Sequence, residues 1–293
     1  MRKLSFVVAI TGCCMLLLAG CNIIESLKNA EHKPNPEAEK WLQTGIDYYD
    51  KGDMEKAEES FSLAIEKDPD FADAYRWKGK ALDRSSPSDN QKLLVLYYYD
   101  TAIQLNPQDE QNYFERGAYF YGSEMYSPAL EDFNKGIRLS QDDYQAYVCR
   151  GLTNLELERF EDSIMDFSRA LEINPDFTMG YLLRGGAYLK LEDYDQAIAD
   201  ITEFIETGPL DVRAFIFRAA AYSYRADYLS ALSDLNAAIS LEPDLPKSYS
   251  LRADILVKLG NRVEAEKDYR KACEMGYEIA CEELKMILED RGH

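Results

Sequence analysis

The sequence has few of the side chains on which most enzymes depend. Only two of its 293 residues are histidines, His32 and His293, so we expect neither a histidine-based triad nor a histidine metal cluster. It contains no GxGxxG motif and no phosphate-binding loop. Its many carboxylates are typical of solvated helix surfaces rather than of a paired catalytic acid and base. The sequence therefore argues against an enzyme, and we expect no cofactor, no metal and no small-molecule substrate.

Basic residues are also scarce. Lys and Arg together number 33 against 53 Asp and Glu, which gives a net charge of −20. This balance repels nucleic acid and anionic lipid surfaces, so a nucleic-acid partner is not expected. The simplest interpretation is a solvated acidic exterior that keeps an extended protein in solution.

No apolar run is long enough to stay in a membrane as a spanning helix. The run from Leu4 to Leu18 has about 15 residues, roughly 22 Å as a helix, whereas a bilayer core needs ~20. Arg2 and Lys3 precede it, and "LAGC", ending at Cys21, follows it, which is the layout of a secretory signal over residues 1–21. The quartet resembles a bacterial lipobox, which implies cleavage before Cys21 and a diacylglycerol thioether on it. The alternative is an ordinary signal peptide with a chance cysteine.

This resemblance predicts a lipid-anchored protein of the cell envelope. Asn22 follows the cysteine and resembles lipoproteins sorted to the outer membrane, where the protein would face the periplasm. In an organism with one membrane, the same anchor leaves it on the outer face of the cell. Residues 22–37 are polar and contain two prolines, which predicts a tether.

Cysteines are few once the signal is set aside. Cys13 and Cys14 would leave with the signal and Cys21 would carry lipid, so Cys149, Cys273 and Cys281 remain. A lone Cys149 next to an arginine is interpreted as a small buried hydrophobe rather than as a nucleophile.

The rest of the chain repeats itself. Large aromatic residues recur every 34 residues, with one spacing of 38, and a small residue follows each of them by four positions. The aromatic residues are Trp41, Tyr75, Tyr113, Tyr147, Tyr181, Phe215 and Tyr249, and the small ones are Gly45, Gly79, Gly117, Gly151, Gly185, Ala219 and Ala253. This pattern resembles the tetratricopeptide repeat, present seven times.

The resemblance implies an all-α, right-handed superhelical solenoid of about seven helix pairs with a C-terminal capping helix. Apolar residues at helical spacing in "YLLRGGAYLKL" and "QAIADITEFIE" independently predict one such pair. Seven pairs and the capping helix make fifteen predicted helices. Because Gly185 has no Cβ atom, its helix can lie close to the next one. The predicted repeats are residues 38–71, 72–109, 110–143, 144–177, 178–211, 212–245 and 246–279, followed by a capping helix and tail over 280–293.

One repeat carries an insertion. "DRSSPSDNQK", residues 83–92, predicts a loop by its composition and accounts for the spacing of 38. It is either a tolerated surface insertion or a loop that carries binding specificity.

Five arginines recur inside the helix pattern, each followed by an aspartate sixteen residues later, and the first repeat lacks both charges. Their joint presence and absence predict structural ion pairs, either within one repeat or from an aspartate to the arginine of the next repeat. The residues are Arg116 and Asp132, Arg150 and Asp166, Arg184 and Asp200, Arg218 and Asp234, and Arg252 and Asp268.

In the resembled family the first helix of each repeat lines a concave groove. The corresponding positions here are mostly apolar and predict a partner-binding groove made of Phe114, Tyr121, Val148, Leu152, Leu155, Met179, Leu182, Leu189, Ile216 and Tyr224. The alternative is that part of this set packs under the neighbouring helix. The second repeat offers Arg76, Lys80 and Arg84 together, which predicts a small basic patch.

The segment "ACEMGYEIAC" places Cys273 and Cys281 eight residues apart. On one straight helix they would lie ~12 Å from each other, beyond the ~7 Å limit for a disulfide, so the chain would have to turn between them. The segment resembles Sel1-like repeats, in which cysteines at this spacing link adjacent helices. That resemblance implies a disulfide between Cys273 and Cys281.

Together these features predict a non-catalytic, lipid-anchored scaffold or adaptor that binds peptide segments or helices of cell-envelope proteins in its groove. In plan it resembles outer-membrane lipoproteins of this repeat class that recruit peptidoglycan hydrolases and proteases. The alternative within the same class is a pilotin-like assembly factor for pilus or secretin components. An envelope enzyme and a purely structural spacer are the alternatives from other classes.

Overall fold

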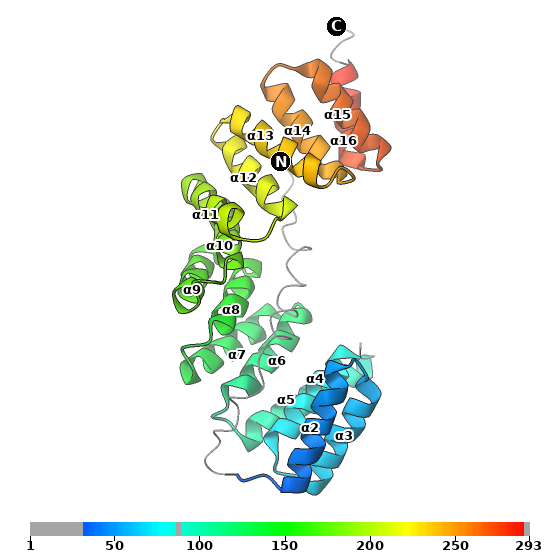
Figure 1. The fold of residues 1–293 in the computed structure, drawn as a ribbon, viewed down its shortest axis with the longest axis vertical. Helices are drawn as coiled ribbons and strands as arrows, with labels where there is room; N and C mark the ends of the chain where they lie inside the picture. The colour runs from blue at the N-terminus through cyan, green and yellow to red at the C-terminus, as the bar shows by residue number, and fades with distance from the viewer. Residues whose placement is uncertain (1–31, 86–88, 290–293) are drawn as a thin grey trace. The chain divides into compact units, whose positions relative to one another are not determined.

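The computed structural model describes residues 32–85 and 89–289, and all fifteen regular elements in this part of the chain are α-helices (Figure 1). The predicted all-α repeat fold is confirmed. The predicted signal segment, Cys21 and most of the predicted tether lie outside the described residues. No helix among the described residues is long and apolar enough to cross a membrane.

The helices fall into two compact units, one ending at Arg159 and the other beginning at Phe160. In the first unit they are α2 (Pro36–Asp50), α3 (Met54–Lys67), α4 (Ala72–Arg84), α5 (Asp89–Leu105), α6 (Glu110–Gly122), α7 (Tyr126–Leu139) and α8 (Tyr144–Glu156). In the second they are α9 (Phe160–Ile173), α10 (Met179–Lys190), α11 (Tyr194–Thr207), α12 (Val212–Tyr224), α13 (Tyr228–Leu241), α14 (Pro246–Lys258), α15 (Arg262–Glu274) and α16 (Glu278–Glu289).

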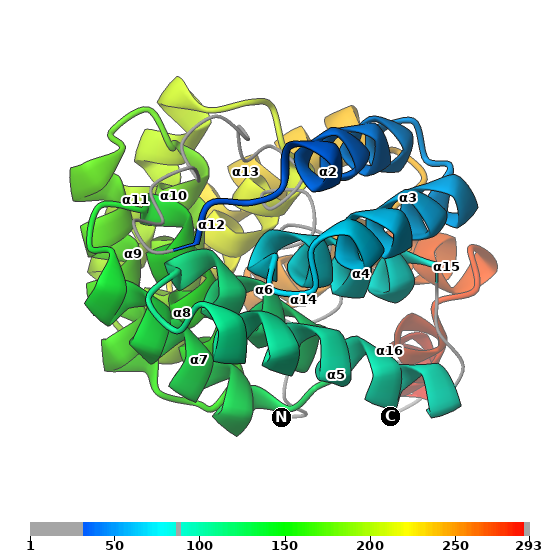
Figure 2. The ribbon, with the colours of Figure 1, turned by 90° about the horizontal axis from the view of Figure 1, so that it is seen from below.

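Within each unit, every helix packs against the next one along the chain, and Figure 2 shows α2 to α5 lying side by side. Polar side chains fix where many helices begin, because they accept hydrogen bonds from backbone N–H groups that the first turn leaves free. Asp109 accepts from the Gln111 amide (3.0 Å) and Asp211 from the Arg213 amide (2.8 Å).

Small residues let the two helices of a pair approach closely. A Cβ atom on Gly185 of α10 would lie 2.7 Å from Ile201 Cγ1 of α11. A Cβ atom on Gly45 of α2 would lie 2.4 Å from Phe61 Cε1 of α3. Both partners are fully buried, so the missing side chain at each glycine is what makes room for a core residue.

The predicted loop over residues 83–92 is wrong in its extent. Helix α4 continues to Arg84, and α5 already begins at Asp89. Polar residues at a helix start have the composition of a loop, because the first turn of a helix also favours acidic and polar side chains.

The recurring arginines join helices of neighbouring repeats. Arg184 donates two hydrogen bonds to Asp200 of its own repeat (2.7 and 2.8 Å) and a third to Ser168 of the preceding second helix (3.0 Å). Arg218 and Arg252 repeat this arrangement, with Asp234 and Thr202, and with Asp268 and Asn236. Arg116 does so with Asp132 and Asp100. We call each such set of contacts an arginine clip.

The two arrangements left open by the sequence are therefore resolved for four pairs: the aspartate lies in the same repeat. The hydrogen bonds that Arg184 donates to the Asp200 carboxylate are the main cause that raises the pKa of Arg184 above its usual range. Arg150 donates to Asn134 (2.9 Å) within the first unit, whereas its expected partner Asp166 belongs to the second unit, and that pair stays a prediction.

The clip at Arg218 allows a direct test of this role. Asp234→Ala should lower the free energy of unfolding by about 3 kcal/mol, because it leaves a largely buried guanidinium without its carboxylate. The double variant Arg218→Leu and Asp234→Ala should lose less than the sum of the two single variants. Urea unfolding followed by circular dichroism measures all three. Strictly additive losses would show that the pair contributes no interaction.

Candidate functional site

Six of the ten predicted groove residues are buried, which corrects the sequence interpretation. Their side chains are at most 6% exposed, so they do not line an open groove. They are Phe114 and Tyr121 on α6, Val148 and Leu152 on α8, Leu182 on α10 and Ile216 on α12.

Neighbouring helices cover these positions. Leu182 packs into a buried cluster with Ala214 and Ala221 of α12, the first helix of the following repeat. Phe114 lies over Gly136 of α7, where a Cβ atom would come within 2.2 Å of its ring. The alternative that these residues pack under a neighbouring helix is therefore correct for Leu182 and Phe114.

The other four predicted groove residues keep some exposure. Leu155, Met179 and Leu189 are half-buried, whereas Tyr224 at the end of α12 is 64% exposed. The Tyr224 ring stacks on that of Tyr194, the first residue of α11, with centroids 5.0 Å apart and planes 9° from parallel.

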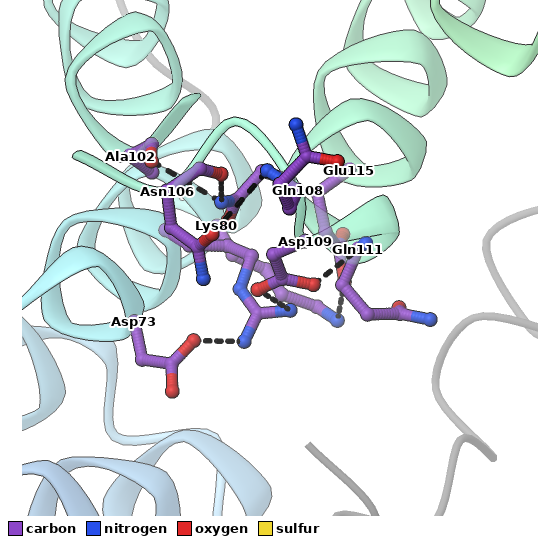
Figure 3. A network of polar contacts seen from close by, with 10 residues as sticks. Asp73, Lys80, Ala102, Asn106, Gln108, Asp109, Gln111 and Glu115 are labelled. Carbon is purple, nitrogen blue, oxygen red and sulfur yellow. Dashed lines mark hydrogen bonds and ion pairs between the residues drawn. The ribbon is translucent and has the colours of Figure 1, made fainter. Parts of the chain in front are cut away.

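The predicted basic patch is wrong, because acidic side chains neutralise it. Arg76 is buried, donates a hydrogen bond to Asp73 and has Nη1 3.9 Å from Asp109 Oδ2. Lys80 Nζ donates to Glu115 Oε1 at 2.6 Å. Figure 3 shows Asp73, Asp109 and Glu115 gathered in this network, with Lys80 directed toward Glu115.

Only Arg84 among the three predicted basic residues is exposed. Its guanidinium lies 4.7 Å from the centroid of the Tyr49 ring. The spacing along α4 predicted the three cations, but Glu115, the acidic partner of Lys80, lies on α6, 35 residues further along the chain.

A carboxylate beside this network has an unusual proton affinity. Burial, together with the negative charge of Glu115, raises the pKa of Asp83 to about 6. Asp83 therefore changes charge close to neutral pH while it lies in the folded protein.

Two of the three cysteines in the described part of the chain form a disulfide, and the third is a buried thiol. Cys273 of α15 and Cys281 of α16 form a disulfide, with Cα atoms 4.8 Å apart, and Gly276 between them has a φ of 88° where the chain turns. Cys149 is buried on α8, as interpreted from the sequence. Cys21, the predicted lipidation site, lies outside the described residues.

Sequence reasoning missed the acidic turns that join the first and second helix of three repeats. Glu124, Glu158 and Glu192 all have φ near 60°, the left-handed region. Each stands two residues before an aromatic residue: Tyr126, Phe160 and Tyr194. The signal was present as the recurring order glutamate, any residue, aromatic residue at the 34-residue interval.

Four stretches of the chain match models of the same protein family. Two family models, both described as tetratricopeptide repeat, match residues 42–86 and 182–246, and residues 144–177 and 246–275. Together these stretches cover more than half of the chain. No curated protein matches the sequence.

Solved structures share the fold. A tetratricopeptide repeat protein from Parabacteroides merdae is 23% identical, with 87% of this chain and all of that chain covered and a TM-score of 0.60. The pilF protein of Pseudomonas aeruginosa is 19% identical over 71% of this chain and 92% of its own, with a TM-score of 0.61. YrrB, described as a TPR protein with an unusual peptide-binding site, is 24% identical over 64% and 95%, with a TM-score of 0.57.

The raised pKa of Asp83 gives a testable pH dependence. Its pKa in the folded protein, about 6, is higher than the ~3.9 of an unfolded chain, so this group contributes stability at low pH that is lost as the pH rises from about 4 to about 6. Asp83→Asn carries no charge at either pH. Its Tm should therefore exceed that of the wild type at pH 7.5, and the difference should vanish near pH 4.

The exposed Asp50→Asn variant serves as the control, since its Tm should follow that of the wild type at both pH values. Thermal melts by circular dichroism measure the three proteins. A Tm difference between Asp83→Asn and the wild type that is the same at pH 4 and pH 7.5 would contradict the assignment.

Proposed function

We propose that this chain, which belongs to the tetratricopeptide repeat family, is a non-catalytic scaffold that binds segments of other proteins in the cell envelope. Stacked helix pairs present long surfaces from rigid elements, which suits protein–protein interaction. The comparison with YrrB, whose description names a peptide-binding site, supports binding of a peptide segment.

The observation that carries this proposal is an exposed apolar face on α5. Leu93, Leu94 and Tyr97 are 72%, 41% and 56% exposed, in a protein with a net charge of −20. Helix α3 is the counterpart of α5 in the first repeat. Its residues that correspond to Leu93 and Tyr97 are Glu55 and Glu59, and both are exposed. The fold is therefore compatible with charges at these positions, and apolar side chains there favour a protein partner.

The envelope location rests on two features. The segment "LLLAGC" at residues 16–21 resembles a lipoprotein signal, and the disulfide between Cys273 and Cys281 is of the kind that persists in oxidising compartments such as the periplasm. Both support a location outside the cytoplasm, and the signal segment supports the lipid anchor.

The proposed lipid anchor gives the mature protein a defined mass. Protein extracted from membranes should begin at Cys21 and carry a diacylglycerol thioether, which intact mass spectrometry detects. Cys21→Ser should retain residues 1–20 or appear without lipid in the soluble fraction. An unmodified wild-type chain that begins at another residue would contradict the anchor.

Partner capture tests the scaffold function. A photoreactive benzophenone amino acid at position 97 of α5 should form a specific crosslinked complex with another envelope protein in cells. The same amino acid at position 203, the exposed Glu203 of α11, is the matched control and should give only background. If irradiation at position 97 and at position 224 on α12 gives no product above this background, the proposal is wrong.

A further inference from the structure

The left-handed turn at Glu192 carries a side chain that the fold does not require. Left-handed backbone is easy for glycine and costly for residues that have a Cβ atom. At the corresponding turns of the first and seventh repeats, the chain has Gly52 with φ 80° and Gly260 with φ 76°. Glu192 adopts φ 62° at the same place. Glycine at this position would leave the turn without a side chain, whereas Glu192 places a carboxylate there.

A surface pocket surrounds this turn in the second unit. It is lined by Leu191, Glu192, Asp193, Tyr194 and Asp195, together with Arg225 from the turn after α12. Three of these six residues carry carboxylates and one carries a guanidinium. The Arg225 guanidinium is already engaged, because Nη1 lies 2.6 Å from Asp195 Oδ1. The pocket therefore has an excess of negative charge.

An aromatic surface adjoins the carboxylates. Tyr194 lines the pocket, and its ring lies parallel to that of Tyr224, which is 64% exposed. Burial and then the negative charge of Glu192 raise the pKa of the Tyr194 hydroxyl, so Glu192 acts electrostatically on this ring. Leu191 adds an apolar contact at 37% exposure.

We propose that Glu192, Tyr194 and Tyr224 form a binding site for a lysine or arginine side chain of a partner protein segment. The cation would lie against the exposed tyrosine ring and near the Glu192 carboxylate, while its aliphatic stem contacts Leu191. The charge of the pocket argues for this occupant, because an anionic segment would be repelled by the three carboxylates. The inference rests on the proposed scaffold function and names the chemistry of one of its partners.

Peptide binding by the full chain tests the site. The probe is a fluorescein-labelled dodecapeptide that repeats Gly-Ser-Leu-Lys, and its matched control has norleucine in place of each lysine. The lysine peptide should bind at low ionic strength at least about tenfold more tightly than the norleucine peptide, as measured by fluorescence anisotropy. Tyr224→Ala should weaken binding of the lysine peptide by about tenfold.

Glu192→Gly separates binding from folding. It should weaken binding of the lysine peptide by about tenfold while its Tm rises or stays equal, because glycine relieves the left-handed strain. Ala226→Gly is the matched control, since Ala226 has φ 60° at the next turn and carries no charge. Its Tm should also rise or stay equal, but its peptide affinity should not change.

Three results would overturn the inference. They are equal binding of both peptides, a lower Tm for Glu192→Gly, and binding of a neutral oligosaccharide, maltohexaose, in place of the lysine peptide. A separate experiment tests the scaffold function, because crosslinking from position 97 can still capture a partner in cells when the lysine peptide does not bind. A failure of the cationic site is thereby distinguished from a failure of the proposed function.

Discussion

The arginine clip is the directional contact that orients the helices of neighbouring repeats at Arg116, Arg184, Arg218 and Arg252. Apolar packing alone is non-directional, whereas a guanidinium offers donors in a fixed plane. In Arg184, Arg218 and Arg252, the Nε and Nη2 atoms engage the aspartate of their own repeat, and Nη1 reaches a polar side chain of the preceding second helix. One side chain thus fixes three helices relative to one another. Where the second repeat departs from this pattern, Lys78 lies 4.7 Å from the centroid of the Tyr98 ring, so a cation–π contact stands in place of the ion pair.

Periodicity predicted which face of each helix is apolar, but not which neighbour covers it. The 34-residue interval was sufficient for the helix pairs and for the close approach at Gly185. It could not show that Ala214 and Ala221 of α12 cover Leu182, because that depends on the angle between successive repeats. The same limit explains the basic patch, since the partner of Lys80 lies one repeat further along the chain. Leu182 and Lys80 thus both make contacts between successive repeats that the 34-residue interval did not predict.

The turns show how local strain and surface chemistry are connected. Every described turn from a first to a second helix that contains a left-handed residue has either glycine, alanine or glutamate there. Glycine at Gly52 and Gly260 suits the backbone best and offers no side chain. Glutamate in three successive repeats accepts a less favourable backbone and places a carboxylate two residues before an aromatic ring. The choice between them is therefore a choice about the surface rather than about the core.

The contact between α15 and α16 differs from the contacts between the preceding repeats, because a covalent bond takes part in it. In α15, Arg270 stands where Asn236 of α13 accepts a hydrogen bond from an arginine of the following repeat. The position in α16 that would supply that arginine holds Met286, which is 54% exposed, and Arg270 instead donates to Glu266 of its own helix. No arginine clip can therefore join α15 to α16. The disulfide between Cys273 and Cys281 joins the two helices instead, and Ala280 and Ile287 of α16 pack in one apolar cluster with Ala265, Tyr269 and Ala272 of α15.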